Sequence, residues 1–137
     1  MYIFVKSDDS LQIFPFNTNS HFYVKLSEEL SFNNSNKFAL YSITLPSFAS
    51  NNSVREILVL VNVAKESYIG STKLPIVQRY VLTEDKNHLN VLFGNEIYVN
   101  MKNIHTDVIE ITLIDGDTLD LIKFNSGKTY CTFHIKR

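Results

Sequence analysis

Histidine is the side chain of this sequence best suited to bind a metal or to transfer protons. The chain has four of them: His21, His88, His105 and His134. Zinc and similar metals are held by several such ligands, commonly at short, regular spacing, whereas these four lie far apart. His21 and His134 fall on the expected outer faces of strands. We therefore expect surface or interface histidines and no bound metal.

Three aspartates surround a glycine near the C-terminal end: Asp115, Asp117 and Asp120 around Gly116. A calcium-binding loop supplies more oxygen ligands at regular positions and usually closes with a glutamate. This segment does not offer that set. We expect a hairpin turn followed by a solvated strand.

Cys131 is the only cysteine, which excludes an intrachain disulfide and a cysteine-based zinc site. It alternates with Phe133 and Ile135, and alternation along a strand places side chains on one face. We therefore expect a buried and inert thiol. His134 lies three residues further along and falls on the opposite face, so the two side chains are not placed as a nucleophile and its base.

Other motifs of catalysis are missing from the sequence. Its glycines, Gly70, Gly94, Gly116 and Gly127, are isolated, so there is no glycine-rich phosphate loop. No Gly-x-Ser-x-Gly elbow occurs either. The sequence predicts no catalytic residue and no cofactor. An enzyme of the cupin type is the least favoured reading, because it needs histidines and carboxylates that converge inside the fold.

Acidic and basic residues nearly balance, with 14 Asp and Glu against 13 Lys and Arg, and the net charge is −1. No overall positive field attracts nucleic acid or anionic lipid. No apolar run reaches the roughly 18 residues that a membrane helix needs, and residues 1–6 lack the pattern of a signal peptide. We expect neither a nucleic-acid nor a membrane partner, and synthesis inside the host cell without secretion by a signal peptide.

Helical periodicity is nearly absent, and Phe, Tyr and β-branched residues favour strands. The expected strands are residues 2–6, 10–14, 21–26, 37–45, 56–63, 74–82, 88–93, 96–101, 107–114, 118–124 and 128–136. The run at 56–63 is apolar throughout, which is typical of a strand buried on both faces. So many short strands in 137 residues predict one all-β domain over residues 1–137. Its architecture is a two-sheet antiparallel sandwich, with a single jelly roll as the leading subtype.

Turn residues mark the connections between the later strands. Gly94-Asn95 and Asp115-Gly116 each separate two expected strands in the manner of a short hairpin. Asn125-Ser126-Gly127 leads into the last strand, with its glycine free to adopt positive φ. The C-terminal half is therefore expected to be a meander of hairpins. Longer loops at 31–36 and 47–53 are expected to cross between sheets.

Several tyrosines fall on the polar faces of expected strands. They are Tyr23, Tyr41, Tyr98 and Tyr130. Tyrosines in such places either cover solvent-exposed sheet or lie in subunit contacts, where tyrosine is enriched. We take these four as candidate interface residues of a protein that works by assembling.

Three blocks of the sequence resemble a known family. Residues 10–26 are similar to an opening Ser-Leu-x-x-Phe-Pro-x-Asn-Thr followed by a strand that ends in Leu. Residues 38–46 are similar to a strand that begins with an aromatic residue and ends in Pro. Residues 98–133 are similar to a closing series of Tyr-Val-Pro-Val, Ile-Glu-Ile and Phe-x-x-Gly. The blocks resemble the minor capsid (penton-like) single jelly-roll proteins of Polinton/Maverick elements and adintovirus-like viruses.

The likeness covers nearly the whole chain in the same order, although Asn36, Ser71 and Arg79 depart from the family pattern. It implies a structural protein of the virion, without enzymatic activity, from an element with a double-jelly-roll major capsid protein. The implied partners are further copies of the chain, as a pentamer, and the major capsid protein. The implied role is to cap the five-fold vertices.

Other functions of the same fold stay open. The chain can be a binding module, such as a carbohydrate- or receptor-binding head. A concave pocket at the loop end would then use some or all of Asn33, Asn34, Asn51 and Asn52. It can also be an accessory viral factor or a host-domesticated copy.

Overall fold

The computed structural model describes residues 1–49, 53–82 and 89–137. In these ranges the chain forms eleven strands and no helix. The strands are β1 (Tyr2–Lys6), β2 (His21–Phe32), β3 (Lys37–Leu45), β4 (Glu56–Val61), β5 (Ser67–Ile69), β6 (Thr72–Leu74), β7 (Ile76–Val81), β8 (Leu89–Leu92), β9 (Val99–Asn100), β10 (Ile104–Asp115) and β11 (Tyr130–Lys136). The described residues therefore contain no helix of the length and apolarity that crossing a membrane requires.

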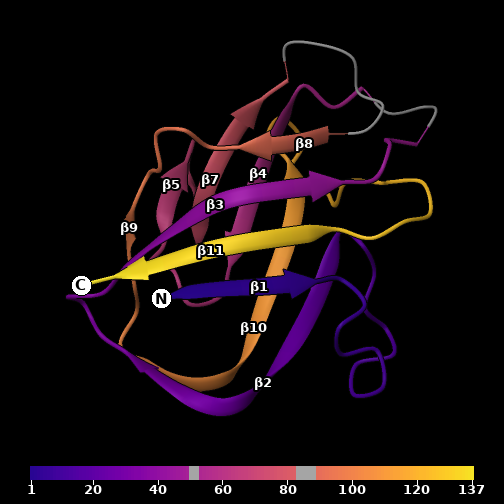
Figure 1. The fold of residues 1–137 in the computed structure, drawn as a ribbon. Helices are drawn as coiled ribbons and strands as arrows, with labels where there is room; N and C mark the ends of the chain where they lie inside the picture. The colour runs from indigo at the N-terminus through magenta and orange to yellow at the C-terminus, as the bar shows by residue number, and fades with distance from the viewer. Residues whose placement is uncertain (50–52, 83–88) are drawn as a thin grey trace.

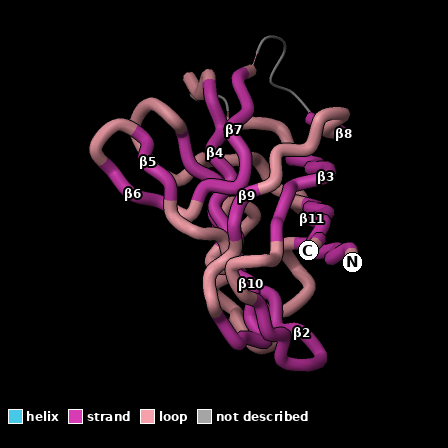
Figure 2. The backbone as a smooth tube through the Cα atoms, turned by 90° about the vertical axis from the view of Figure 1, so that its left-hand side faces the viewer, coloured by secondary structure: helices cyan, strands magenta, loops and turns pink. Residues whose placement is uncertain are grey.

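The long strands form two antiparallel sheets that pack against each other (Figure 1). The first sheet has the order β1-β11-β3-β8, and the short β9 also pairs with β3. The second sheet has the order β2-β10-β4-β7. β5 and β6 form a separate hairpin that projects from the sandwich (Figure 2). The expected fold class, an all-β two-sheet antiparallel sandwich, is confirmed.

Strands from the first half of the chain pair with strands from the second half in reverse order. β1 pairs with β11, β2 with β10, β3 with β8 and β4 with β7, so that the first half of the chain runs beside the second half. The first four of these strands alternate between the two sheets. This order is the double Greek key of a jelly roll.

Alternation of side chains builds the core between the sheets. In β1 the odd-numbered Ile3 and Val5 are buried, and in β11 Phe133 and its alternate neighbours are buried in the same way. Phe38 of β3 stacks on Phe133 with ring centres 4.9 Å apart. Fully burying an apolar side chain of this kind stabilises the fold by about 1.5–3 kcal/mol.

β4 is buried along its whole length, as the continuous apolar run predicted. Its inner face, which includes Ile57 and Val59, belongs to the main core. Its outer face carries Leu58 and Leu60, and these are covered by a second apolar cluster that includes Ile69 of β5 and Leu74 of β6. The β5–β6 hairpin therefore explains why this strand is apolar on both faces.

Two of the expected strands do not form. Residues 10–14 turn back on themselves, because the amides of Ile13 and Phe14 both donate to the carbonyl of Ser10. Residues 118–124 make only isolated bridges, at Leu121 and Phe124. Leu119 has φ of 63°, a left-handed conformation that interrupts an extended run.

The predicted meander of hairpins is also wrong. The strands on either side of Gly94-Asn95 are β8 and β9, and both pair with β3 rather than with each other. Asp115-Gly116 does form a turn, but no regular strand follows it. The expected strand 74–82 is divided at Pro75, which has no amide hydrogen for the ladder. Gly127 has φ of 144°, so its predicted positive φ is confirmed.

Candidate functional site

Three of the four candidate tyrosines lie on the outer face of the first sheet. Tyr41 belongs to β3, Tyr130 to β11, and Tyr98 precedes β9. Tyr98 contacts His134, which also points outward from β11. Tyr23 lies in β2, on the outer face of the second sheet. The structure therefore brings three of these residues to one surface and leaves the fourth on another.

The pairing of β3 with β11 has a bulge at Tyr41. Thr132 of β11 lies opposite Ser42, whereas the next residue, Phe133, lies opposite Leu40. Tyr41 is thus the extra residue of β3 in this pair of strands. Because of the extra residue, Tyr41 and Ser42 are both partly exposed between buried Leu40 and Ile43. The Tyr41 ring lies with its centre 5.7 Å from that of Tyr2.

We call this outer surface of the first sheet the aromatic face. Its side chains are those of Tyr2, Phe4, Tyr41, Tyr98, Tyr130 and His134. Tyr2 lies at its centre, with its ring 4.6 Å from that of His134 and 6.2 Å from that of Phe4. Tyr2, Phe4 and Tyr130 are 50%, 74% and 44% exposed. Aromatic side chains gathered in one exposed patch are typical of a binding surface.

Sequence reasoning missed Tyr2 and Phe4 as members of this surface, whereas it placed His134 on an outer face. The signal was present in part, because residues 2, 4 and 6 alternate with buried Ile3 and Val5. What joins them to the tyrosines is the pairing of β1 with β11, which sets Tyr2 opposite His134. That pairing joins opposite ends of the chain.

A chain of hydrogen bonds links Glu96, Tyr98 and His134 on the aromatic face. The Tyr98 hydroxyl donates to Glu96 Oε2 at 2.5 Å and lies 2.7 Å from His134 Nδ1. The bond to Glu96, followed by desolvation and the Glu96 charge, raises the pKa of Tyr98 to about 12. With its hydrogen given to Glu96, the Tyr98 oxygen is left to accept from Nδ1–H of His134. This holds Tyr98 neutral and oriented, as a binding side chain rather than a nucleophile.

Cations border the same face. The Lys136 ammonium lies 3.7 Å from the centre of the Tyr98 ring, a cation–π contact. Lys6 lies at the other end of β1, opposite Tyr130 in the pairing with β11. The face therefore has an aromatic centre with Lys136 at one end of β1 and, at the other end, Lys6, whose ammonium lies 3.8 Å from Asp9 Oδ1.

Tyr23 belongs to a second aromatic cluster, which the chain covers with its own loop. Phe14 and Phe16 lie with their ring centres 5.3 Å and 5.7 Å from that of Tyr23. His21 Nε2 lies 2.8 Å from a carboxylate oxygen of Glu110. A hydrogen bond to Glu110 also raises the pKa of Tyr23. The Tyr23 side chain is thus half-buried within the molecule, beneath residues of the β1–β2 connection.

The residues with catalytic potential are placed apart. Cys131 is buried as predicted, and burial raises the pKa of its thiol to about 12. His105 lies on the surface, where its Nδ1 is 2.6 Å from the Ser31 hydroxyl. His88 lies outside the described residues. Among the residues that the structure describes, no group of three His, Cys, Asp or Glu side chains could hold a metal ion.

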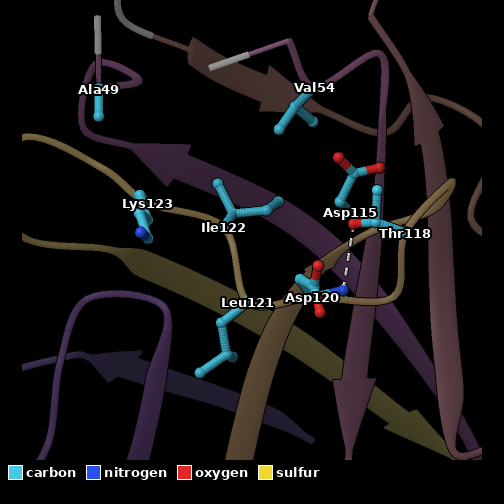
Figure 3. Close-up of a pocket in the computed structure, with 8 residues that line it drawn as sticks. All are labelled: Ala49, Val54, Asp115, Thr118, Asp120, Leu121, Ile122 and Lys123. Atoms are coloured by element: carbon cyan, nitrogen blue, oxygen red, sulfur yellow. Dashed lines mark hydrogen bonds between the residues drawn. The ribbon is translucent and has the colours of Figure 1, made fainter. Parts of the chain in front are cut away.

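Two of the three aspartates around Gly116, Asp115 and Asp120, line a cavity of about 280 Å³ (Figure 3). Asp117 N donates to Asp115 Oδ1 at 2.8 Å, and Asp120 N donates to Thr118 Oγ1 at 3.3 Å. The Asp115 and Asp120 carboxylates point in different directions in Figure 3. These residues shape a turn, as the sequence predicted, rather than a converging set of oxygen ligands.

The asparagines of the alternative binding site are only partly described. Asn33 accepts from Ser35 N at 2.8 Å, and Asn34 N donates to Asn103 Oδ1 at 3.2 Å. Both therefore build the turn between β2 and β3. Asn51 and Asn52 lie outside the described residues.

A larger polar hollow lies elsewhere, between the β1–β2 connection and the turn before β11. It measures about 490 Å³, and its lining includes Asp8, Asn17, Asn19, Ser126 and Lys128. Asp8 and Lys128 form an ion pair at 2.9 Å, which lowers the pKa of Asp8 and raises that of Lys128. Amide, hydroxyl and charged groups thus surround one open concavity.

Comparison with known proteins identifies no relative. A scan against protein-family models found no match to this chain, and a search of curated proteins found none either.

Proposed function

We propose that this chain is a structural subunit of a viral shell: a minor capsid, penton-like protein that assembles at capsid vertices. The observation that carries the proposal is the exposed aromatic face on the first sheet of a jelly roll. Jelly rolls serve as capsid proteins, lectins and cupins. An exposed aromatic patch on such a scaffold favours a function in contacts between proteins.

The sequence resemblance supports the same proposal. The block at residues 10–26 contributes the loop that covers Tyr23, and the block at 38–46 contributes β3, at the middle of the first sheet. Both blocks resemble the penton-like proteins of Polinton/Maverick elements and adintovirus-like viruses. The likeness therefore includes segments on which the sandwich depends.

The interior favours a structural role over an enzyme of the cupin type. The side chains that the two sheets direct at each other are apolar, and they include Phe22, Phe38 and Phe133. His21 and His134 lie on outer faces, where they bond with Glu110 and Tyr98. A cupin-type site would require such groups to converge within the sandwich.

The partners in this proposal are further copies of the chain and the major capsid protein. A five-fold ring is a heterologous assembly, in which each subunit uses two different patches. The net charge of −1 permits close packing of copies with little self-repulsion. We assign the aromatic face to one of these contacts, with Tyr41, Tyr98 and Tyr130 among its residues.

The proposal is tested by co-expression with a double-jelly-roll major capsid protein from an adintovirus-like element. We expect the wild-type chain to co-purify with assembled shells and to appear at their vertices in electron micrographs. The double substitution Tyr41→Ser, Tyr130→Ser should abolish this incorporation, whereas Tyr68→Ser on the exposed β5–β6 hairpin should not. Shells that never contain the wild-type chain would contradict the proposal.

A binding module is the second candidate, and the polar hollow favours it. Its volume of about 490 Å³ lies in the range of ligand pockets, and its amides and hydroxyls suit a carbohydrate. Glycan-array binding by the purified chain, lost on Asn19→Ala with thermal unfolding unchanged, would support this function; the unfolding control is needed because Asn19 Nδ2 also donates to the carbonyls of Asn125 and Gly127. Binding that is unchanged by that substitution would reject the hollow as the site.

A further inference from the structure

The edge of the second sheet is closed by the chain itself. β2 is an edge strand, and residues 7–20 run beside it. Asn17 donates to the carbonyl of Tyr23 at 2.8 Å and accepts from its amide at 2.9 Å. Ser10 Oγ accepts from the amide of Lys25 at 2.9 Å. Proteins commonly protect sheet edges in such ways, because unpaired backbone groups recruit other strands.

The edge of the first sheet is left open over part of β1 (Figure 1). Met1 and Ile135 exchange both backbone hydrogen bonds, and Ser7 N donates to Thr129 O. Between these two points β1 and β11 pair without a bulge, and in an antiparallel pair every second residue bonds to the neighbouring strand. The odd-numbered residues of β1 therefore bond to β11. The N–H and C=O groups of Tyr2, Phe4 and Lys6 therefore point away from the sheet.

One of these three residues is capped and two are not. Lys6 N donates to Asp9 Oδ2 at 2.8 Å, and Asp9 N donates to Lys6 O at 3.1 Å. In the part of the chain that the structure describes, no group plays this role for Tyr2 or Phe4. Their side chains are also among the most exposed aromatics, so the open backbone lies beside an apolar surface.

We propose that the open edge of β1 binds an extended segment of another protein by strand addition. Alternating N–H and C=O groups are matched by the backbone of a further strand, which is how peptides join exposed sheet edges. The segment carries apolar or aromatic residues at alternate positions, where they meet Tyr2 and Phe4. This inference does not depend on the shell function.

The charges at the N-terminal end of β1 indicate which residues the bound segment carries there. Lys136 and Arg137 line a hollow of about 480 Å³ together with Met1, at the N-terminal end of β1. Acidic residues are the complement to this end. In an antiparallel addition they lie at the C-terminal end of the bound segment.

A second copy of β1 offers less charge complementarity than an acidic segment. In an antiparallel pair with Tyr2 opposite Phe4, Lys6 of each copy would lie near Lys136 and Arg137 of the other. Asp9, the ion-pair partner of Lys6, would only offset this repulsion. A foreign segment with acidic residues alone at this end meets the same cations without an opposing lysine.

A proline substitution can test the backbone contact alone. Phe4→Pro removes an amide that points away from β11, and proline is tolerated on an exposed strand edge. Val5→Pro removes an amide that bonds to β11 and should destabilise the fold. Phe4→Val keeps the amide and an apolar side chain, and it serves as the matched binding control.

The experiment selects random 12-residue peptides on phage against the wild-type protein and measures the enriched peptides by fluorescence anisotropy. We expect alternating apolar residues followed by acidic residues. Affinity should fall about tenfold in Phe4→Pro, the cost of a lost hydrogen bond, and by no more than about threefold in Phe4→Val. The thermal unfolding of Phe4→Pro should match that of the wild type, and its native mass should match that of Phe4→Val, which makes the same change to the aromatic face.

Three results would overturn the proposal. The first is that no peptide is enriched, and the second is that enriched peptides bind the folded Phe4→Pro protein as tightly as the wild type. The third is wild-type self-association that Phe4→Pro abolishes and Phe4→Val preserves, which would make the backbone of a second copy the occupant. Loss of vertex incorporation in the co-expression experiment is a separate readout, so the two proposals can fail independently.

Discussion

Asn17 and Tyr23 are joined by two hydrogen bonds that imitate a strand pair. The Asn17 amide nitrogen donates to the Tyr23 carbonyl at 2.8 Å, and Asn17 Oδ1 accepts from the Tyr23 amide at 2.9 Å. The same loop lays the rings of Phe14 and Phe16 against Tyr23. One side chain thus closes an edge that would otherwise be open to other strands, and it ties the loop to the sheet.

Asn17→Ala should destabilise the protein. The substitution leaves the amide and carbonyl of Tyr23 without their protein partners, which costs about 1–2 kcal/mol in a partly buried position. Urea unfolding of the variant measures this loss. Asn95→Ala, on an exposed turn, is the control and should leave the free energy of unfolding unchanged. Equal stability of the two variants would show that water replaces the Asn17 contacts without cost.

Gly116→Ala should be costlier than an ordinary glycine substitution. A Cβ atom at this position would lie 2.6–2.7 Å from the side chain of Glu56. Glu56 cannot move freely, because it accepts from Arg79 Nε at 2.6 Å and from Nη2 at 3.2 Å. Overpacking of this kind costs about 1–3 kcal/mol.

Gly94→Ala is the matched control for Gly116→Ala, since nothing lies within 4 Å of the added atom. Thermal unfolding should show a lower midpoint for Gly116→Ala than for Gly94→Ala. A midpoint for Gly116→Ala equal to that of the control would mean that Glu56 and Arg79 rearrange at no cost.

The Cys131 thiol should be unreactive in the native protein. Burial raises its pKa from 9.0 to about 12, so the thiolate is scarce at pH 8. A thiol-specific colour reagent should therefore react only after the protein unfolds. Thr132→Cys places a second thiol on the outer face of the same strand and should give one fast-reacting group. Fast reaction of the wild-type protein at pH 8 would contradict the buried placement.

The same shift gives a direction to the pH dependence of stability. The pKa of the Cys131 thiol is higher in the folded chain than in the unfolded chain, so folding favours the protonated form. Its contribution is fully present below pH 9.0 and is lost as the pH rises toward about 12. Urea unfolding at a series of pH values in this window measures the decline, and Cys131→Ala should reduce it.

Glu96→Gln should lower the pKa of Tyr98 from about 12 toward the ordinary value of 10.0, because the bond to Glu96 is the largest cause of the shift. Absorbance titration of tyrosinate measures the change, and Tyr98→Phe identifies which step belongs to this residue. An identical titration of wild type and Glu96→Gln would contradict the hydrogen-bonded chain.

Local patterns predicted the strands well where alternation was strict and turn residues were clear. Residues 2–6 and 37–45 form strands at the predicted bounds, and the burial of Cys131 followed from its alternation with Phe133. The segment 10–14 has the composition of a strand but forms turns around Ser10. Nothing in its composition distinguishes these two outcomes, because the choice is made by contacts with β2.

Pairing over long distances was the harder part to predict. The short turn at Gly94-Asn95 suggested a local hairpin, whereas β8 and β9 each bond to β3. The aromatic face has the same origin, since Tyr2 meets Tyr41 and His134 only after β1 docks on β11. Tyr23 carries the same sequence signal as Tyr41, yet its own loop covers it.

Assembly through the aromatic face, as proposed above, can be examined in the purified protein by measuring its native mass. We expect a discrete species of five times the 15.8 kDa chain mass. That species should be lost in Tyr41→Ser, Tyr130→Ser and kept in Tyr68→Ser. A strict monomer at high concentration that also ignores a co-expressed major capsid protein would contradict the claim.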